Sequence, residues 1–197
     1  MRPHTNQGGK LMIYVALLRG INVGGKNKID MKLLKETFVR IGMESVVTYI
    51  NSGNVIFTDI EHIKEEIVAI IEKAIFENFQ FHIKVLIRSI DDFHYMMRIL
   101  PESWKNNEDM KCDVLFLWEE IDNEEVLNKL VIKPKIDTVM YIPGAVLWSV
   151  DKRNVTKSGL MKLVSTALYK RMTVRNVNTT RKVYAIMQGL DKASLKK

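Results

Sequence analysis

The residues with the clearest capacity for chemistry form a glycine-rich, basic loop near the start of the chain. An apolar run at 13–18 leads into Arg19-Gly-Ile-Asn-Val-Gly-Gly-Lys-Asn-Lys28, which contains three glycines, two asparagines and two lysines. A strand that feeds such a loop commonly presents backbone N–H groups and cations to an anion. We therefore expect a phosphate-bearing ligand to contact Arg19, Asn22, Gly24, Gly25 and Lys26.

The same loop comes within one residue of the phosphate-binding loop of nucleotide hydrolases, G-x-x-x-x-G-K-S/T. Gly20, Gly25 and Lys26 match that pattern, but Asn27 stands where a hydroxyl would hold Mg²⁺. A hydrolase loop also lies in a parallel sheet, whereas a hairpin signal follows this one. The sequence therefore disfavours nucleotide hydrolysis. It leaves open phosphate binding without hydrolysis and a turn whose glycines serve backbone geometry alone.

Hydrophobic periodicity predicts six elements over residues 12–89. They are strand, helix, strand, strand, helix and strand, at 13–18, 31–41, 45–50, 55–58, 63–75 and 83–87. Asn51-Ser-Gly-Asn54 separates the two middle strands and is typical of a hairpin turn. This order is that of the ferredoxin-like fold, in which two helices cover one face of a four-stranded antiparallel sheet.

The second half of the chain repeats that order after a short helix and a polar, Asn-rich stretch. Strands are expected at 113–118, 136–142, 145–150 and 172–175, helices at 122–130 and 157–169, and a last helix at 180–189. We predict an α+β protein with two tandem ferredoxin-like (βαββαβ, alpha-beta plait) subdomains plus a C-terminal helix. The expected divisions are a disordered leader at 1–11, subdomains at 12–89 and 111–190, and a helix with a polar linker at 90–110.

This topology predicts two clusters of polar side chains. The loop after the first strand and the turn between the second and third strands lie at one end of such a sheet, so Ser52 and Asn54 should join Arg19, Asn22 and Lys26. A second cluster should bring together Lys157, Ser158, Arg175, Asn176 and Asn178. Cations with amide or hydroxyl donors are the groups that contact phosphate or sugar. For Ser158 and Asn178, helix capping is at least as strong an interpretation.

The net charge of +7 is unevenly distributed along the chain. Residues 152–190 contain nine Lys or Arg residues and no Asp or Glu, and such a local field attracts phosphates. A solvated basic face explains the same run equally well. The partners indicated are a phosphate-bearing small molecule or nucleic acid, and the oligomeric state stays open.

Composition excludes several classes of protein. Cys112 is the single cysteine, so no internal disulfide can form, which fits a reducing compartment and favours the cytoplasm. The apolar run at 11–18 is too short to span a bilayer, and no small-residue cleavage site follows it. The four histidines lack metal-ligand spacing. We therefore expect no metal, no cofactor and no membrane partner.

Four stretches of the chain resemble DUF1697, a bacterial family of uncharacterised proteins. They are Tyr14-Val-Ala-Leu-Leu-Arg-Gly-Ile-Asn-Val-Gly-Gly-Lys-Asn-Lys28, Thr48-Tyr-Ile-Asn-Ser-Gly-Asn-Val55, Thr156-Lys-Ser158 and Thr173-Val-Arg-Asn-Val-Asn-Thr179. The resemblance covers nearly all of residues 12–190. It implies tandem ferredoxin-like subdomains, and it implies no activity.

The sequence thus favours a cytoplasmic protein that binds a phosphate-bearing ligand, a nucleotide or nucleic acid, through its glycine-rich basic loop. One alternative is an enzyme acting on a phosphorylated metabolite, with Arg19 and Lys26 holding the phosphate. Another is a protein-interaction module whose loops are purely structural. No residue is assigned a catalytic role.

Overall fold

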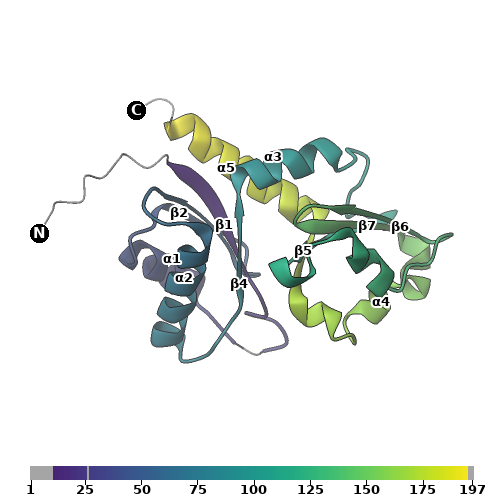
Figure 1. Cartoon of the computed structure of the whole chain (residues 1–197), viewed down its shortest axis with the longest axis horizontal. Coiled ribbons are helices and arrows are strands. Elements are labelled where there is room, and N and C mark those ends of the chain that lie inside the picture. The colour runs from purple at the N-terminus through teal and green to yellow at the C-terminus, as the bar shows by residue number, and fades with distance from the viewer. Residues whose placement is uncertain (1–10, 26, 195–197) are drawn as a thin grey trace, which may run out of the picture. The chain divides into compact units, whose positions relative to one another are not determined.

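The computed structural model describes residues 11–25 and 27–194, and it shows an α+β chain with two four-stranded antiparallel sheets and a long C-terminal helix (Figure 1). The chain divides into two compact units. The first takes the chain up to Ile90 and again from Ala185 onward, and the second takes Asp91–Tyr184. Of the residues expected as a leader, all but Leu11 lie outside the described residues, and so does Lys26.

The sheet of the first unit has the strand order β2-β3-β1-β4, and every neighbouring pair is antiparallel. Its strands are β1 (Met12–Leu18), β2 (Glu44–Tyr49), β3 (Asn54–Asp59) and β4 (Val85–Ser89), and its helices are α1 (Met31–Arg40) and α2 (Lys64–Phe79). Leu34 and Phe38 of α1, together with Ile67 and Ile71 of α2, are fully buried in one core with Phe57 of β3. Each element predicted over 12–89 is therefore present, in the predicted order.

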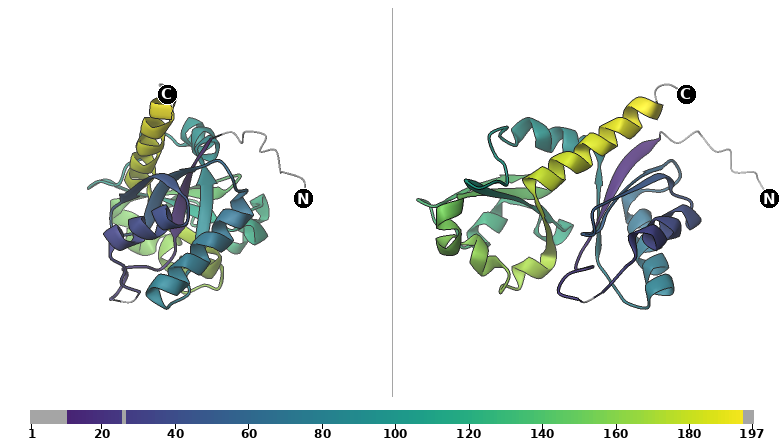
Figure 2. Two further views of the ribbon diagram at one scale, coloured as in Figure 1. Left: turned by 90° about the vertical axis from the view of Figure 1, so that its left-hand side faces the viewer. Right: turned by 180° about the vertical axis from the view of Figure 1, so that it is seen from behind.

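The sheet of the second unit has the strand order β6-β7-β5-β8. Its strands are β5 (Met110–Leu117), β6 (Asp137–Ile142), β7 (Ala145–Asp151) and β8 (Met172–Asn176). On one face, Leu115 and Trp148 pack with Leu160 and other residues of the segment between β7 and β8. On the other, Phe116 stacks on Phe93 of α3 (Ile90–Ile99) at a ring-centroid distance of 5.9 Å. Figure 2 shows α3 and the start of α5 (Val177–Ser194) on that second face.

The helix predicted at 122–130 is wrong. The segment instead forms the 3₁₀ helix η2 (Glu124–Lys129), and another 3₁₀ turn, η1 (Glu119–Ile121), precedes it. The Oδ1 of the Asp122 side chain accepts the Tyr141 hydroxyl at 3.0 Å and the Gly144 N–H at 2.8 Å. These bonds fasten the segment to the β6–β7 hairpin, so no continuous helix starts there.

The helix predicted at 157–169 is also wrong in extent. Only the single turn α4 (Leu160–Leu163) is α-helical, between the 3₁₀ turns η3 (Lys152–Lys157) and η4 (Leu168–Arg171). The Ser165 hydroxyl donates to the Lys162 carbonyl at 2.8 Å, and the Thr166 hydroxyl donates to the Leu163 carbonyl at 2.7 Å. Because side chains take carbonyls that a further helical turn would use, α4 ends after one turn.

The polar stretch that follows α3 is fastened to α5. Trp104 is buried, and Arg181 of α5 donates to its carbonyl and, at 2.7 Å, to the carbonyl of Pro101. Asn106 and Asn178 exchange two hydrogen bonds, at 3.1 and 2.9 Å. The stretch expected as a linker is therefore held by specific contacts within the second unit.

Candidate functional site

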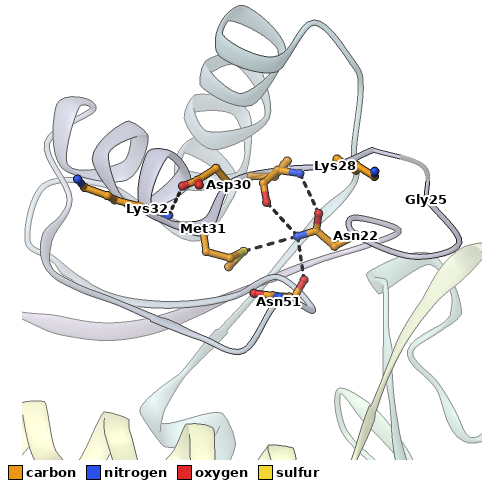
Figure 3. A pocket seen from close by; sticks show the side chains of 8 residues that line it. Asn22, Gly25, Lys28, Asp30, Met31, Lys32 and Asn51 are labelled. Atoms are coloured by element: carbon orange, nitrogen blue, oxygen red, sulfur yellow. Dashed lines mark hydrogen bonds between the residues drawn. The ribbon is translucent and has the colours of Figure 1, made fainter.

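Asn22 holds the two ends of the glycine-rich loop together (Figure 3). Its φ of 54° lies in the left-handed region, which asparagine tolerates better than most residues. Its Oδ1 accepts the Ile29 N–H at 2.8 Å, and its Nδ2 donates to the carbonyls of Ile29 at 3.1 Å and Asn51 at 3.0 Å. Since both amide hydrogens have acceptors, this side chain fastens the loop to the hairpin turn.

The β2–β3 hairpin turn is itself held against β1. The Leu18 N–H donates to the Gly53 carbonyl at 2.8 Å. Gly53 has a φ of +73°, and a Cβ there would lie 2.8 Å from the Leu18 Cβ, so only glycine fits. Asn54 is fully buried, and its Nδ2 donates to the Tyr49 carbonyl at 3.1 Å and to the Ser52 hydroxyl at 3.0 Å. Ser52 and Asn54 therefore shape the turn, and Asn54 presents no surface to a ligand.

The predicted meeting of the glycine-rich loop with the hairpin turn is confirmed by the hydrogen bond from Asn22 to Asn51. Arg19 is half-buried at the end of β1, and its N–H donates to the Lys84 carbonyl at 3.0 Å. Gly24 is exposed with open space around it, and so is Gly25. Lys26 lies outside the described residues.

A hollow of about 660 Å³ opens beside this loop and the start of α1 (Figure 3). Its lining consists of Asn22, Gly25, Lys28, Ile29, Asp30, Met31, Lys32 and Asn51. Lys28 and Lys32 are exposed and stand on either side of the Asp30–Met31 segment. Asp30 is the acid among the described lining residues, and its Oδ1 already accepts the N–H groups of Lys32 at 2.8 Å and Leu33 at 2.9 Å. Two cations and one carboxylate leave the hollow with a positive balance.

Ser158, of the predicted second cluster, belongs to a buried network around Asp137. One carboxylate oxygen of Asp137 accepts the Ser158 hydroxyl and, at 3.1 Å, the indole N–H of Trp148. The other accepts the N–H groups of Lys133 at 2.9 Å and Gly159 at 3.0 Å. Burial pushes the pKa of Asp137 up, but these hydrogen bonds, led by that of Ser158, outweigh burial and hold the pKa below its usual value. Ser158 therefore has a structural role, because its hydroxyl holds the segment after β7 to Asp137.

The remaining residues of the predicted cluster lie around the end of β8. Arg175 is 8% exposed, its Nη1 donates to the Thr173 hydroxyl at 2.9 Å, and burial lowers its pKa to about 10. The Asn176 Oδ1 accepts the Thr179 N–H at 2.7 Å at the start of α5, as a helix cap does. Asn178 pairs with the stretch that follows α3, as described above. Capping thus falls to Asn176 and not, as one interpretation had it, to Asn178.

The two parts of the expected second cluster are not brought together. Ser158 is bonded to Asp137 on the edge strand β6, whereas Arg175 lies on the opposite edge strand β8, with β7 and β5 between them. Three strand spacings amount to about 14 Å. Both segments leave the same end of the sheet, as the topology predicted, but they leave it from opposite edges.

A pair formed by the buried Asp59 carboxylate and the partly exposed His62 imidazole, just before α2, was missed by sequence reasoning. The Asp59 Oδ2 lies 3.0 Å from the His62 Nδ1, and the Asp59 Oδ1 accepts the N–H groups of Glu61 and His62. The hydrogen bond to Asp59 raises the pKa of His62. Burial raises the pKa of Asp59. The hydrogen bonds from His62 and the two backbone N–H groups lower it by more, so the pKa of Asp59 stays below its usual value. The Asp-x-x-His spacing at a strand end was the available signal.

This pair should make stability depend on pH. A histidine whose pKa rises on folding stabilises the protein fully below its unfolded pKa of about 6.5, and this is lost as pH rises through the folded value. Asp59, with a lowered pKa, contributes above about pH 4. His62→Asn should thus cost more unfolding free energy near pH 5 than near pH 8, by less than about 1 kcal/mol because the imidazole is partly exposed. Urea unfolding at both pH values measures the difference.

The matched control is His94→Asn, because His94 lies 3.6 Å from Asp91 with both side chains exposed. Its substitution should leave the unfolding free energy nearly unchanged at both pH values. An equal cost of His62→Asn at the two pH values would contradict the assigned role of the pair.

Within the part of the chain that the structure describes, no three His, Cys, Asp or Glu side chains are grouped as a metal site would need. Nor does any described helix combine the length and apolarity needed to cross a membrane.

Residues 12–148 match the family described as "Protein of unknown function (DUF1697)", which is well over half of the chain. The chain belongs to the DUF1697 family. This confirms the resemblance drawn from its motifs. No curated protein matches this DUF1697 chain.

Among solved structures, this DUF1697 chain is similar to the conserved bacterial protein SP0830 from Streptococcus pneumoniae. The two share 29% sequence identity with a TM-score of 0.78, over 90% of this chain and 99% of that one. The DUF1697 match itself contains the glycine-rich loop, the hairpin turn and Asp137, while Ser158 and Arg175 lie beyond its end.

Proposed function

We propose that this DUF1697 protein binds a phosphate-bearing ligand, a nucleotide or nucleic acid, in the hollow beside its glycine-rich loop. The observation that carries the proposal is the hollow itself. It opens between the loop, the hairpin turn and the first turn of α1, where Lys28 and Lys32 flank it. The proposal therefore rests on Lys28 and Lys32, whereas the sequence favoured Arg19 and Lys26 as the cations.

The chemistry of the lining suits a phosphate in three ways. Lys28 and Lys32 supply mobile ammonium donors, whose charge-assisted hydrogen bonds to phosphate are about twice as strong as neutral ones. Gly25 lets a ligand approach the backbone closely, because no side chain stands there. The hydrogen bonds of Asn22 to Ile29 and Asn51 hold the walls in place before a ligand arrives. Such preorganisation reduces the entropy lost on binding.

The test compares a site variant with a charge-matched control. Lys28→Ala/Lys32→Ala removes both flanking cations, while Lys35→Ala/Lys73→Ala removes two exposed lysines that do not line the hollow. Isothermal titration calorimetry with inorganic pyrophosphate, a nucleoside triphosphate and a short oligonucleotide measures affinity. We expect the site variant to bind at least one of these probes about tenfold more weakly, equivalent to about 1.4 kcal/mol. The control should match the wild type.

Equal affinities of the site variant and the wild type would overturn the proposal and leave the loop a structural turn. An equal loss in both double variants would also overturn it, because the effect would then follow net charge and not the hollow.

We also infer that each unit is a ferredoxin-like subdomain and that the protein works in the cytoplasm. The first inference is supported by the βαββαβ order of the first unit and by the strand order that both sheets share. The second is supported by the single cysteine, Cys112, which is buried and free.

A further inference from the structure

The second unit carries a row of exposed cations that the proposed hollow does not use. They lie on η3, α4 and η4, the segment that covers one face of the sheet, and we call them the basic strip: Lys152, Lys157, Lys162, Lys170 and Arg171. From 152 to 171 the sequence holds six Lys or Arg residues and no Asp or Glu. The sixth, Arg153, is paired with Asp151 at 2.7 Å.

The side chains of the basic strip face solvent because of the local structure around α4. Leu160 and Leu163 of α4 are buried against the sheet, which leaves Met161 and Lys162 on the solvent side of the same turn. Val164 follows on that side and is 65% exposed. Among the described residues, no hydrogen bond or ion pair engages the charged group of any member of the basic strip. The acidic turns η1 and η2 cover the same face of the sheet. The cations of the basic strip are therefore unpaired within the described part of the chain, although the unit contains acidic residues on that face.

The strip is long. The Lys152 N–H donates to the Asp109 carbonyl at 2.7 Å, just before β5 begins, and the Trp118 N–H donates to the Arg171 carbonyl at 3.2 Å, just after β5 ends. The segment therefore runs the whole length of β5, whose eight residues span about 26 Å. A single nucleotide could meet only one or two of these cations, whereas a polymer of phosphates could meet all of them.

We propose that the basic strip binds the phosphate backbone of nucleic acid without reading its sequence. Cations spaced along an extended surface match a ligand that repeats its negative charge, and each phosphate neutralised releases a counterion. The exposed Met161 and Val164 offer apolar contact to sugars between the charges. This inference goes beyond the proposed hollow, since it concerns another surface on the other unit and stands or falls separately.

The test uses fluorescence anisotropy of labelled duplex and single-stranded DNA at several salt concentrations. If all five cations contact phosphates, log K should fall with log salt at a slope of about −4.5 on duplex. Lys157→Glu/Lys162→Glu should weaken binding more than tenfold and make the slope shallower by about 1.8, or 0.9 for each lost contact. The matched control is Lys129→Glu/Lys135→Glu, two exposed lysines of the same unit outside the strip.

Three results would overturn the proposal. The first is an equal loss of DNA binding in both charge-reversal variants, and the second is the absence of DNA binding in the wild type at low salt. The third is preferential binding to phosphatidylserine vesicles over DNA, abolished by Met161→Ser/Val164→Ser, which would make the strip a membrane surface. Lys28→Ala/Lys32→Ala should leave strip binding intact, so failure here is distinguishable from failure of the proposed hollow.

Discussion

Gly159→Ala should destabilise the protein by at least about 3 kcal/mol, because the added methyl group has nowhere to go. A Cβ at this position would lie 1.4 Å from the carbonyl oxygen of Val131 and 2.6 Å from its carbonyl carbon. Both are backbone atoms, so no rotamer change relieves the overlap. Only a movement of the backbone at Val131 or at Gly159 would relieve the overlap. The backbone at Gly159 is held in place, because its N–H donates to Asp137 at 3.0 Å.

The chain supplies its own control in Gly189→Ala. Gly189 lies within α5, and among the described residues no atom apart from its chain neighbours and the nearby backbone of α5 comes within 4 Å of where its Cβ would be. Alanine there should stabilise the protein by about 0.5–1 kcal/mol, because glycine is a poor helix former. Chemical unfolding followed by circular dichroism compares the two variants. Destabilisation by Gly159→Ala of less than about 1 kcal/mol would contradict the close approach of Val131.

Asp137→Ala should cost about 4 kcal/mol, because it leaves buried donors without an acceptor. Trp148 and Ser158 lose the acceptor of their side chains, and Lys133 and Gly159 lose that of their N–H groups. Asp137→Asn should cost less, since it keeps one carbonyl oxygen but turns an amide N–H₂ toward two donors. The order of stability should therefore be wild type, Asp137→Asn, Asp137→Ala.

The Asp137 carboxylate also makes the unfolding free energy depend on pH in the acid range. Its pKa is lowered by folding, so its contribution is present above the unfolded value of about 4 and is lost as pH falls through the folded value. Unfolding monitored by tryptophan fluorescence should thus show the gap between wild type and Asp137→Asn narrowing below about pH 4. Leu33→Ala, which truncates a side chain that is 40% exposed on α1, is the control and should cost far less. A wild-type stability equal to that of Asp137→Ala at neutral pH would contradict the network.

These two predictions bear on how binding experiments should be interpreted. Ser158 is among the candidate ligand residues predicted from the sequence, and Gly159 follows it directly in the chain. In the structure both serve Asp137, so a loss of binding after their substitution would report unfolding and not a lost ligand contact. Variants of exposed cations such as Lys28 or Lys162 avoid this ambiguity, since exposed lysines contribute little to stability.

The sequence by itself determined the elements of the first unit and the meeting of its two loops. Strands and long helices leave strong periodic signals, and Asn51-Ser-Gly-Asn54 signals a hairpin through backbone conformation alone. Once that order is known, the direction of each strand places the glycine-rich loop beside the turn, as the bond from Asn22 to Asn51 confirms. The sequence motifs also predicted membership of the DUF1697 family.

Only the tertiary structure decided what individual polar residues do. Local pattern suggested a helix at 122–130, but the Asp122 side chain bonds to the distant β6–β7 hairpin, and such a long-range bond overrides helical periodicity. The strand order then put Ser158 and Arg175 at opposite edges of one sheet. Asp137 accepts hydrogen bonds from Trp148, Ser158 and Gly159, which lie 11 to 22 residues further along the chain. Hydrophobic pattern is a property of neighbours in sequence, whereas the partner of a buried polar group is a property of the fold.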